Sequence, residues 1–320
     1  TIEADQTNAS VVVGERAIVK WFRRAGPDSS RAATLIAHLD ERGFREMPAP
    51  LGSLVWRSPS GADLTLAQGA AYLPGAVDGW DWCLARLERH VAHGAGECPT
   101  DCDPWIGAPL GRLVERLHTA LLTPSAAIPT PTTVAHPDAV VAWHVLALAT
   151  LDDAIRLTAE QDPAAGAALA AIEPAIRADL ERLPVGQPTP IQPVHGDLHV
   201  GQILEWSGGL AVIDFDGNPA LGNDANALRQ PVERDIAQML ASLDHLGRVV
   251  DERTAGHARR IIDDWVARTR REFVGALDAD CTLLAAFEAE QECRELVYAA
   301  RFLPRWRYAP LATLLARYGR

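Results

Sequence analysis

Residues 195–202 read HGDLHVGQ, and residues 213–216, which follow a short apolar hairpin, read IDFD. Asp197 lies in a tight loop that contains glycine, where its carboxylate can accept a proton from an acceptor hydroxyl. Gln202 supplies an amide oxygen and Asp214 a carboxylate oxygen, and Mg²⁺ favours both ligand types. These are among the few protein groups that phosphoryl transfer from ATP requires. A satisfied histidine in a loop, or a fragment of a metal hydrolase, would explain HGDLH alone but not the DFD that follows.

The chain holds a single lysine, Lys20, among its 30 lysine and arginine residues. In a chain that otherwise uses only arginine, lysine is expected where a compact ammonium fits and a planar guanidinium does not. Lys20 lies in AIVKW, residues 17–21, whose alternation is typical of a strand. This resembles the strand lysine with which kinases contact ATP phosphates. Lys20 is therefore predicted to bind the phosphates of ATP.

The order of predicted elements indicates an α+β chain with two lobes. The first part predicts strand, strand, helix, strand, strand, which is a small antiparallel sheet with one helix. A break at YLPG, residues 72–75, separates it from a mostly helical part, and ligands prefer the cleft between such lobes. We predict an N-terminal lobe at 1–73 and a C-terminal lobe at 74–320. The expected elements are a hairpin at 9–22, a helix at 28–42, strands at 52–56 and 63–69, helices at 78–92, 109–122, 138–158 and 164–183, a hairpin at 202–215 and helices to the end.

Composition excludes several classes of protein. The 320 residues carry a net charge of −12, which argues against the basic surface that nucleic-acid binding needs. No apolar stretch is long enough for a membrane span. The five scattered cysteines predict a reduced, cytoplasmic protein without a zinc site. The chain begins at Thr1, already close to a predicted strand, so we expect further residues upstream.

Several segments resemble the actinobacterial maltokinase and glucosamine kinase group of the aminoglycoside-phosphotransferase-like kinases. The resemblance runs nearly end to end, and Gln202 stands where the wider superfamily usually has Asn. It implies a bilobal protein-kinase-like fold, often preceded by an N-terminal cap region, with ATP and Mg²⁺ as cofactors. The segments are DQTNASVVVGERAIVKWF (5–22), GWDW (79–82), LGRLVERLH (110–118), HGDLHVGQIL (195–204), VIDFDGNPA (212–220) and ELVYAARFLPRW (295–306).

The resemblance also implies where ATP binds. The turn at residues 6–10, including Ser10, would cover the phosphates, and Gln68 and Ala70 would lie at the lobe junction beside adenine. Related kinases pair the strand lysine with a glutamate on the next helix. The corresponding segment offers no obvious glutamate in its first turns, and the imperfect candidates are Asp28, Asp40 and Glu41. The partner of Lys20 is therefore left open.

The acceptor is predicted to be a small sugar. The segment EAEQECRELVY, residues 288–298, carries four glutamates, and a carboxylate favours an ammonium group through a charge-assisted hydrogen bond. This favours glucosamine, with Asp197 facing the 6-hydroxyl that ATP phosphorylates. The predicted substrate residues are Asp197, His199, Asp216, Glu292, Glu295 and Trp306, with Tyr298 as an alternative aromatic platform.

Other interpretations stay open at this point. Glutamates on a helix face are often solvated surface, and Asp235 is a candidate either to cap a helix or to brace the catalytic loop. A maltokinase-like enzyme would act on the anomeric hydroxyl of maltose, and an aminoglycoside phosphotransferase would also suit an acidic pocket. A nucleotide-binding pseudokinase is disfavoured because Lys20, Asp197, Gln202 and Asp214 are all present. The sequence does not specify an oligomeric state.

Overall fold

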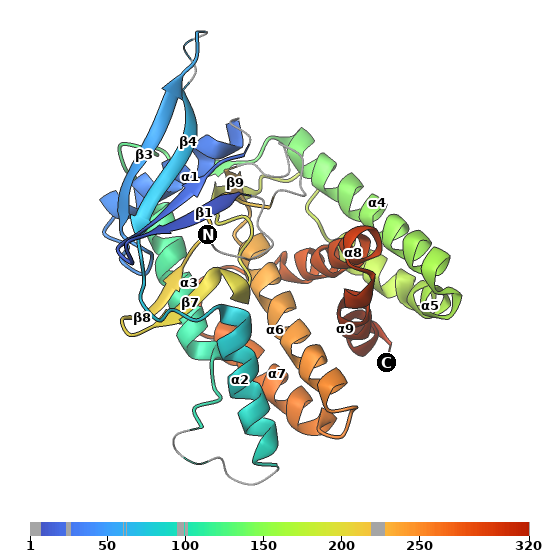
Figure 1. Cartoon of the computed structure of the whole chain (residues 1–320). Helices are drawn as coiled ribbons and strands as arrows, with labels where there is room; N and C mark the ends of the chain where they lie inside the picture. Colours follow the sequence, from blue (N-terminus) through green and yellow to red (C-terminus); the bar gives the residue numbers. More distant parts are fainter. Residues whose placement is uncertain are drawn as a thin grey trace.

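The N-terminal part of the chain forms a small antiparallel sheet with one helix (Figure 1). The computed structural model describes residues 8–23, 27–59, 61, 63–94, 99, 102–218 and 228–319. The sheet order is β1-β2-β4-β3, and the helix packs against β4 and β3. The elements are β1 (Ala9–Val13), β2 (Ala17–Trp21), α1 (Pro27–Glu41), β3 (Pro50–Arg57) and β4 (Asp63–Ala71).

The predicted hairpin at the start of the chain is present. Gly14 and Glu15 both have positive φ, 57° and 51°, as a tight connection between antiparallel strands requires. β2 lies between β1 and β4, so its lysine stands on an interior strand. Lys20 is directly opposite Ser10 of β1 and Gln68 of β4. Because opposite residues project from the same face, these three side chains form one row across the sheet.

The second part of the chain is mostly helical, as predicted. It contains α2 (Gly79–Ala92), α3 (Gly107–Leu122), α4 (Pro137–Gln161), α5 (Pro163–Leu180), α6 (Glu233–Arg253), α7 (Arg259–Val274), α8 (Leu284–Phe302) and α9 (Tyr308–Tyr318). Its short strands are β5 (Thr133–Val134), β6 (Pro190–Pro193), β7 (Ile203–Trp206), β8 (Gly209–Val212) and β9 (Arg229–Gln230). Short 3₁₀ helices lie at η1 (Val200–Gln202) and η2 (Pro304–Trp306). The division into domains at 1–73 and 74–320 stays a prediction.

The helical lobe is organised around α6, which contacts α2, α7, α8 and α9. Figure 1 shows α6 running through the middle of this lobe, with α8 and α9 on one side. Most of the α6 residues are buried, including polar ones. The helical spacing of apolar residues in α3 also predicted burial correctly, because all five are fully buried: Leu110, Leu113, Val114, Leu117 and Leu121. Within the described ranges, none of the helices has the length and apolar character needed to cross a membrane.

Candidate active site

Lys20 joins the two lobes through the carboxylates that follow β8. Its Nζ lies 2.6 Å from Asp214 Oδ1 and 2.6 Å from Asp216 Oδ2. Asn8 adds a third contact, because its Nδ2 donates to Asp216 Oδ2 at 2.9 Å. The strand lysine and the strand-end aspartate, which the sequence singled out 194 positions apart, are therefore in direct contact.

The pKa values of the three charged groups at this junction shift in different directions. Burial opposes the charge of Lys20, but Asp214 and Asp216 outweigh it and raise the pKa of the ammonium. Burial likewise opposes the charge of Asp214, yet Lys20 lowers the pKa of that carboxyl. Burial raises the pKa of Asp216, and the neighbouring Asp214 adds to this effect. Of the two carboxyls, Asp214 is therefore the one that Lys20 holds in its charged form.

The partner that was left open for Lys20 comes from the helical lobe. Asp40 contacts Arg45 instead, and Glu41 accepts a hydrogen bond from the backbone of Ala126 at 3.0 Å. The side chain of Asp28 lies outside the described residues. Lys20 is paired with Asp214 and Asp216 in place of an acid on α1.

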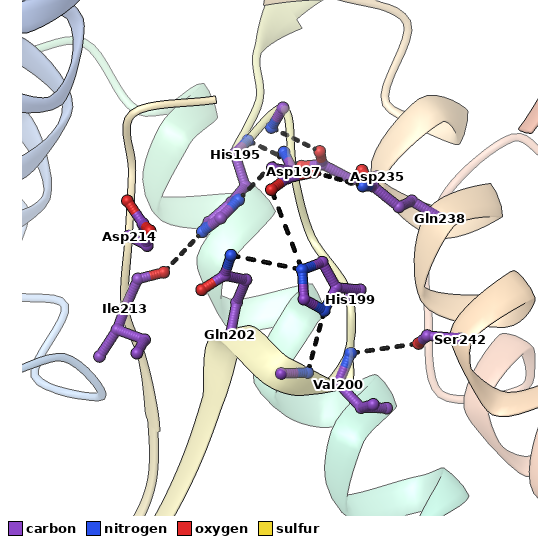
Figure 2. Close-up of polar contacts among 12 residues, drawn as sticks. His195, Asp197, His199, Val200, Gln202, Ile213, Asp214, Asp235, Gln238 and Ser242 are labelled. Carbon is purple, nitrogen blue, oxygen red and sulfur yellow. Dashed lines mark hydrogen bonds and ion pairs between the residues drawn. The ribbon is translucent and has the colours of Figure 1, made fainter. Parts of the chain in front are cut away.

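The β7–β8 hairpin places Gln202 beside Asp214. The backbone N–H of Ile213 donates to the carbonyl of Gln202 at 2.9 Å, so the two ends of the hairpin are held together. Asp214 has a φ of 63°, unusual for a residue with a side chain and common at functional sites. Figure 2 shows the side-chain oxygen of Gln202 on the side of Asp214, while its nitrogen faces His199 at 3.4 Å.

This donor set fits Mg²⁺. An amide oxygen and a carboxylate oxygen are hard ligands, and Mg²⁺ usually takes one or two such groups together with water and phosphate oxygens. In the part of the chain that the structure describes, there is no cluster of three or more His, Cys, Asp or Glu that would form an all-protein cage. The arrangement therefore suits an ion that is shared with a nucleotide.

Asp235 braces the loop that carries Asp197. Its carboxylate is fully buried and accepts hydrogen bonds from the backbone N–H groups of His195 and Gly196, each at 2.8 Å. His118 provides a third contact at 3.1 Å. Burial opposes the charge, but the contact with His118 and these donors keep the pKa of Asp235 below its usual range. Of the two roles considered for Asp235, the structure shows the bracing one.

His195 links the same loop to the strand end. Its Nε2 donates to the carbonyl of Ile213 at 2.9 Å, and its Nδ1 accepts from the backbone N–H of Asp197 at 3.3 Å. Burial lowers the pKa of His195, which keeps the ring neutral and able to make both contacts. Figure 2 shows this ring between Asp197 and Ile213.

Arg31 of α1 is a site residue that sequence reasoning missed. This buried guanidinium donates to the carbonyl of Phe215 and to that of Val194, both at 2.7 Å. It therefore holds the segment after Asp214 and the segment before His195 at once. A signal was available, because Arg31 continues the apolar stripe of Leu35 and Leu39 at four-residue spacing, where a charged residue is unexpected.

The Asp197 carboxylate is held from α6. Gln238 Nε2 donates to Asp197 Oδ1 at 2.5 Å, and His199 Nε2 lies 3.9 Å from Asp197 Oδ2 (Figure 2). His199 also accepts a hydrogen bond from the backbone N–H of Gly201 at 3.1 Å, which caps the start of η1, the 3₁₀ helix that contains Gln202. The loop thus presents Asp197 and Gln202 from a rigid framework.

The acidic residues of α8 are buried and paired. Glu288 contacts Arg270 and Arg317, Glu290 contacts Arg234, and Glu292 contacts His245. For these three the interpretation as solvated surface was wrong. Buried carboxylates need partners to offset their desolvation, and the arginines that supply them come from α6, α7 and α9.

Glu292 is paired with a histidine, whereas Glu288 and Glu290 are paired with arginines. Its Oε2 lies 2.8 Å from Nε2 of His245, and both side chains are 4 % exposed. Its Oε1 is buried and, within the described structure, has no hydrogen-bond partner. Oε2 of Glu290 also lacks a hydrogen bond from the described residues, but it lies 3.1 Å from Nη1 of Arg234. Glu295, one turn after Glu292, accepts from Gln291 at 2.9 Å. A buried carboxylate oxygen without a partner is costly, so a ligand donor is the natural complement.

An aromatic side chain lies beside His245, the partner of the Glu292 carboxylate. The Trp306 ring meets the ring of His245 edge-on at 5.6 Å and the ring of Trp80 at 5.8 Å. His245 therefore contacts both Trp306 and Glu292, the two of these residues that were predicted to bind the acceptor. Tyr298, the alternative platform, packs against Phe302 at 5.2 Å and is exposed.

The small antiparallel sheet carries a lysine on an interior strand, and the helical lobe facing it carries an aspartate on a braced loop. Together these features define a kinase-like phosphotransferase. Residues 1–218 match the phosphotransferase enzyme family, and the chain belongs to this family.

Curated relatives match nearly the whole chain. A glucosamine kinase of Streptacidiphilus jiangxiensis is 43 % identical over 97 % of this chain and 71 % of its own length. A glucosamine kinase of Mycolicibacterium smegmatis is 35 % identical over 98 % of this chain and 78 % of its own. A solved glucosamine kinase in complex with glucosamine, ADP and inorganic phosphate has 39 % identity and a TM-score of 0.85, covering 98 % of this chain and 80 % of that one.

Proposed function

We propose that this protein is an ATP-dependent glucosamine kinase that converts glucosamine to glucosamine 6-phosphate. The observation that carries the proposal is the contact between Lys20 and Asp214 at 2.6 Å, next to the braced loop of Asp197. The relatives at 43 % and 35 % identity are glucosamine kinases, and one solved relative holds glucosamine together with ADP.

Each group of the site has a role in this reaction. Asp197 accepts the proton of the 6-hydroxyl as that oxygen attacks the terminal phosphorus. Lys20 binds the phosphates, which draws its ammonium away from Asp216. Gln202 and Asp214 would hold Mg²⁺, which neutralises phosphate charge when it is bound. The chain itself orients the acceptor and takes up the proton.

The remaining nucleotide contacts follow from the row across the sheet. Ser10 and Gln68 flank Lys20 on neighbouring strands, so their side chains face the same side as the ammonium. We place Ser10 beside the phosphates, and Gln68 with Ala70 at the end of β4 beside the adenine. Gln6 and Thr7, which were expected to contribute to the same turn, lie outside the described residues.

The acceptor site is assigned to the groups around Glu292. The unpartnered Oε1 of this residue would accept a hydrogen bond from the ammonium of glucosamine, which a plain sugar lacks. Glu295 and Trp306 would complete the pocket, while His199 and Asp216 lie on the phosphoryl side near Asp197 and Lys20. A site that reads an ammonium with a buried carboxylate discriminates against glucose and maltose, because the carboxylate is then left without a partner.

The test is ATP consumption with Mg²⁺ against glucosamine, glucose, maltose, N-acetylglucosamine and kanamycin, with phosphorus NMR to locate the phosphate on the product. Asp197→Asn is the matched blank. The expected result is selective turnover of glucosamine at its 6-hydroxyl, abolished by the substitution. Selective turnover of maltose or kanamycin would show that the acceptor is that compound and not glucosamine. ATP binding without turnover of any acceptor would overturn the enzymatic assignment.

A further inference from the structure

One face of α6 carries four buried polar side chains in a regular row. Gln238, Ser242 and His245 follow Asp235 by three, seven and ten positions, the spacing that keeps side chains on one side of a helix. We call these four residues the α6 polar row. All four are less than a tenth exposed. Burial of so many polar groups on one line requires a partner for each of them.

Every member of the α6 polar row contacts a different part of the site. Asp235 holds the backbone of His195 and Gly196, and Ser242 Oγ accepts from the backbone N–H of Val200 at 3.1 Å. Figure 2 shows these contacts and that of Gln238 reaching the loop from the same helix. Gln238 contacts the Asp197 carboxylate at 2.5 Å. His245, at the far end, contacts Glu292 at 2.8 Å.

The last two contacts lie far apart along the helix. Gln238 and His245 are seven residues apart, which is about 10 Å along a helix axis. Each of them holds one carboxylate, Gln238 that of Asp197 and His245 that of Glu292.

We propose that Gln238 and His245 are positioning residues that set the orientation of the two acceptor-binding carboxylates. Gln238 holds Oδ1 of Asp197 and leaves Oδ2 for the 6-hydroxyl. His245 holds Oε2 of Glu292 and leaves Oε1 for the ammonium. This inference rests on the proposed glucosamine kinase function, and it adds that one helix sets both ends of the acceptor site.

The two residues are expected to affect different kinetic constants. Gln238 acts on the group that takes the proton, so its loss lowers kcat. His245 acts on the group that binds the ammonium, so its loss raises KM for glucosamine and reduces discrimination against glucose. A purely structural role for the row predicts no such separation, because a loosened fold changes kcat and KM together and lowers the unfolding temperature.

The experiment compares Gln238→Met, which keeps length and removes the donor, with His245→Leu and with His245→Gln, which keeps a donor. We expect Gln238→Met to lower kcat roughly tenfold or more with little change in KM. We expect His245→Leu to raise KM for glucosamine roughly tenfold or more with a smaller change in kcat. We expect His245→Gln to recover part of that loss. Thermal unfolding identifies any variant that fails to fold. If His245→Leu does not fold, His245→Gln is compared with wild type in its place.

The matched control is His38→Gln. His38 is a buried histidine on α1, where it contacts Ser125 at 2.7 Å and the carbonyl of Ala120 at 3.0 Å, outside the proposed site. If wild type turns over glucosamine and the Gln238 and His245 variants show the same kinetic change as each other or as His38→Gln, the positioning roles are wrong while the function stands. If wild type does not turn over glucosamine, both the function and this inference are wrong.

Discussion

Nζ of Lys20 lies at the same distance, 2.6 Å, from one oxygen of Asp214 and one of Asp216, so a single ammonium from the small sheet is paired with two carboxylates of the helical lobe. A nucleotide with its metal ion carries both kinds of charge found in this triad. On the proposed function, phosphates would replace the carboxylates at Lys20, and a metal ion would replace the ammonium at Asp214. Binding would then exchange one set of ion pairs for another.

Replacing the lysine tests this exchange. Lys20→Met should lower kcat/KM for ATP by roughly 100-fold or more, because a preorganised cation on the transferred phosphate is lost. Lys20→Arg should recover little of it, since the larger planar group does not fit the same contacts. Arg57→Lys on β3, whose ion pair with Asp63 is exposed, is the control and should keep full activity. Full activity of Lys20→Arg would contradict the inference that this position requires a lysine.

The proposed metal ligands predict a binding effect that does not depend on turnover. Calorimetric affinity for ADP should rise in wild type when Mg²⁺ replaces a chelator. In Asp214→Asn this gain should largely disappear, because the anionic ligand is gone. Asp138→Asn, whose side chain on α4 is 91 % exposed, is the matched control. An unchanged gain in Asp214→Asn would place the metal ion elsewhere.

The brace of the catalytic loop should contribute to both stability and activity. In Asp235→Asn one of the two carboxylate oxygens becomes an amide nitrogen, so a buried backbone N–H of His195 or Gly196 loses its acceptor. We expect a loss of about 2 kcal/mol in the free energy of unfolding, together with a lower kcat. Thermal denaturation and steady-state kinetics measure the two effects. A stable variant with normal kcat would show that the loop does not need this brace.

The pH dependence of KM reports on the carboxylate that binds the ammonium. Burial raises the pKa of Glu292 to about 7, against the opposing effect of His245. Although burial opposes protonation of His245, Glu292 together with Glu295 and Asp244 raises the pKa of the imidazole to about 9. His245 is therefore charged at neutral pH, whereas Glu292 loses its charge as pH falls below about 7.

KM for glucosamine should accordingly rise as pH falls from 7 to 5.5, a range in which its amine stays protonated, while KM for glucose, which has no ammonium, should stay nearly constant. In Glu292→Gln the rise should disappear, because the amide does not titrate in this range. Initial rates across that range measure both constants. A parallel rise for glucose would assign the pH effect to a different group.

The approach of α2 to the catalytic loop leaves no room for a side chain at its first residue. A Cβ on Gly79 would lie 1.7 Å from the carbonyl oxygen of Val200. Gly79→Ala should therefore cost about 1–3 kcal/mol of stability and lower kcat, because a shift of η1 moves Gln202. Ala85→Gly, an exposed position of the same helix, should cost about 1 kcal/mol and leave kcat unchanged. Equal kinetics for the two variants would contradict the link between α2 and the metal ligand.

Sequence reasoning singled out the residues whose chemistry is unusual in itself. Lys20 was singled out because it is the single lysine of the chain. Asp197, Gln202 and Asp214 were singled out because a candidate proton acceptor and two candidate oxygen ligands for Mg²⁺ lie within 18 residues of one another, and these roles stay predictions. The order of strands and helices followed from local periodicity and turn residues. These features depend on residues that are close together in the sequence, or on composition.

The missed features depend on contacts between distant segments. Arg31 binds carbonyls 163 and 184 positions away, and no pattern in the sequence shows where a backbone carbonyl will lie. Glu288 and Glu290 have the composition of a solvated helix face, but arginines from other helices bury them. Burial of charge is a tertiary property, so local patterning predicts the common outcome and fails where distant partners exist.

Arg31 also constrains how the site can open. A rigid rotation of the small sheet together with α1 would separate the guanidinium from the carbonyls of Val194 and Phe215, leaving buried groups without partners at about 1–3 kcal/mol each. α1 is therefore expected to travel with the catalytic loops. By packing, α1 is part of the small lobe, since it lies against β3 and β4. By hydrogen bonding it belongs to the catalytic loops, so a single helix ties the position of the sheet to that of the loop carrying Asp197.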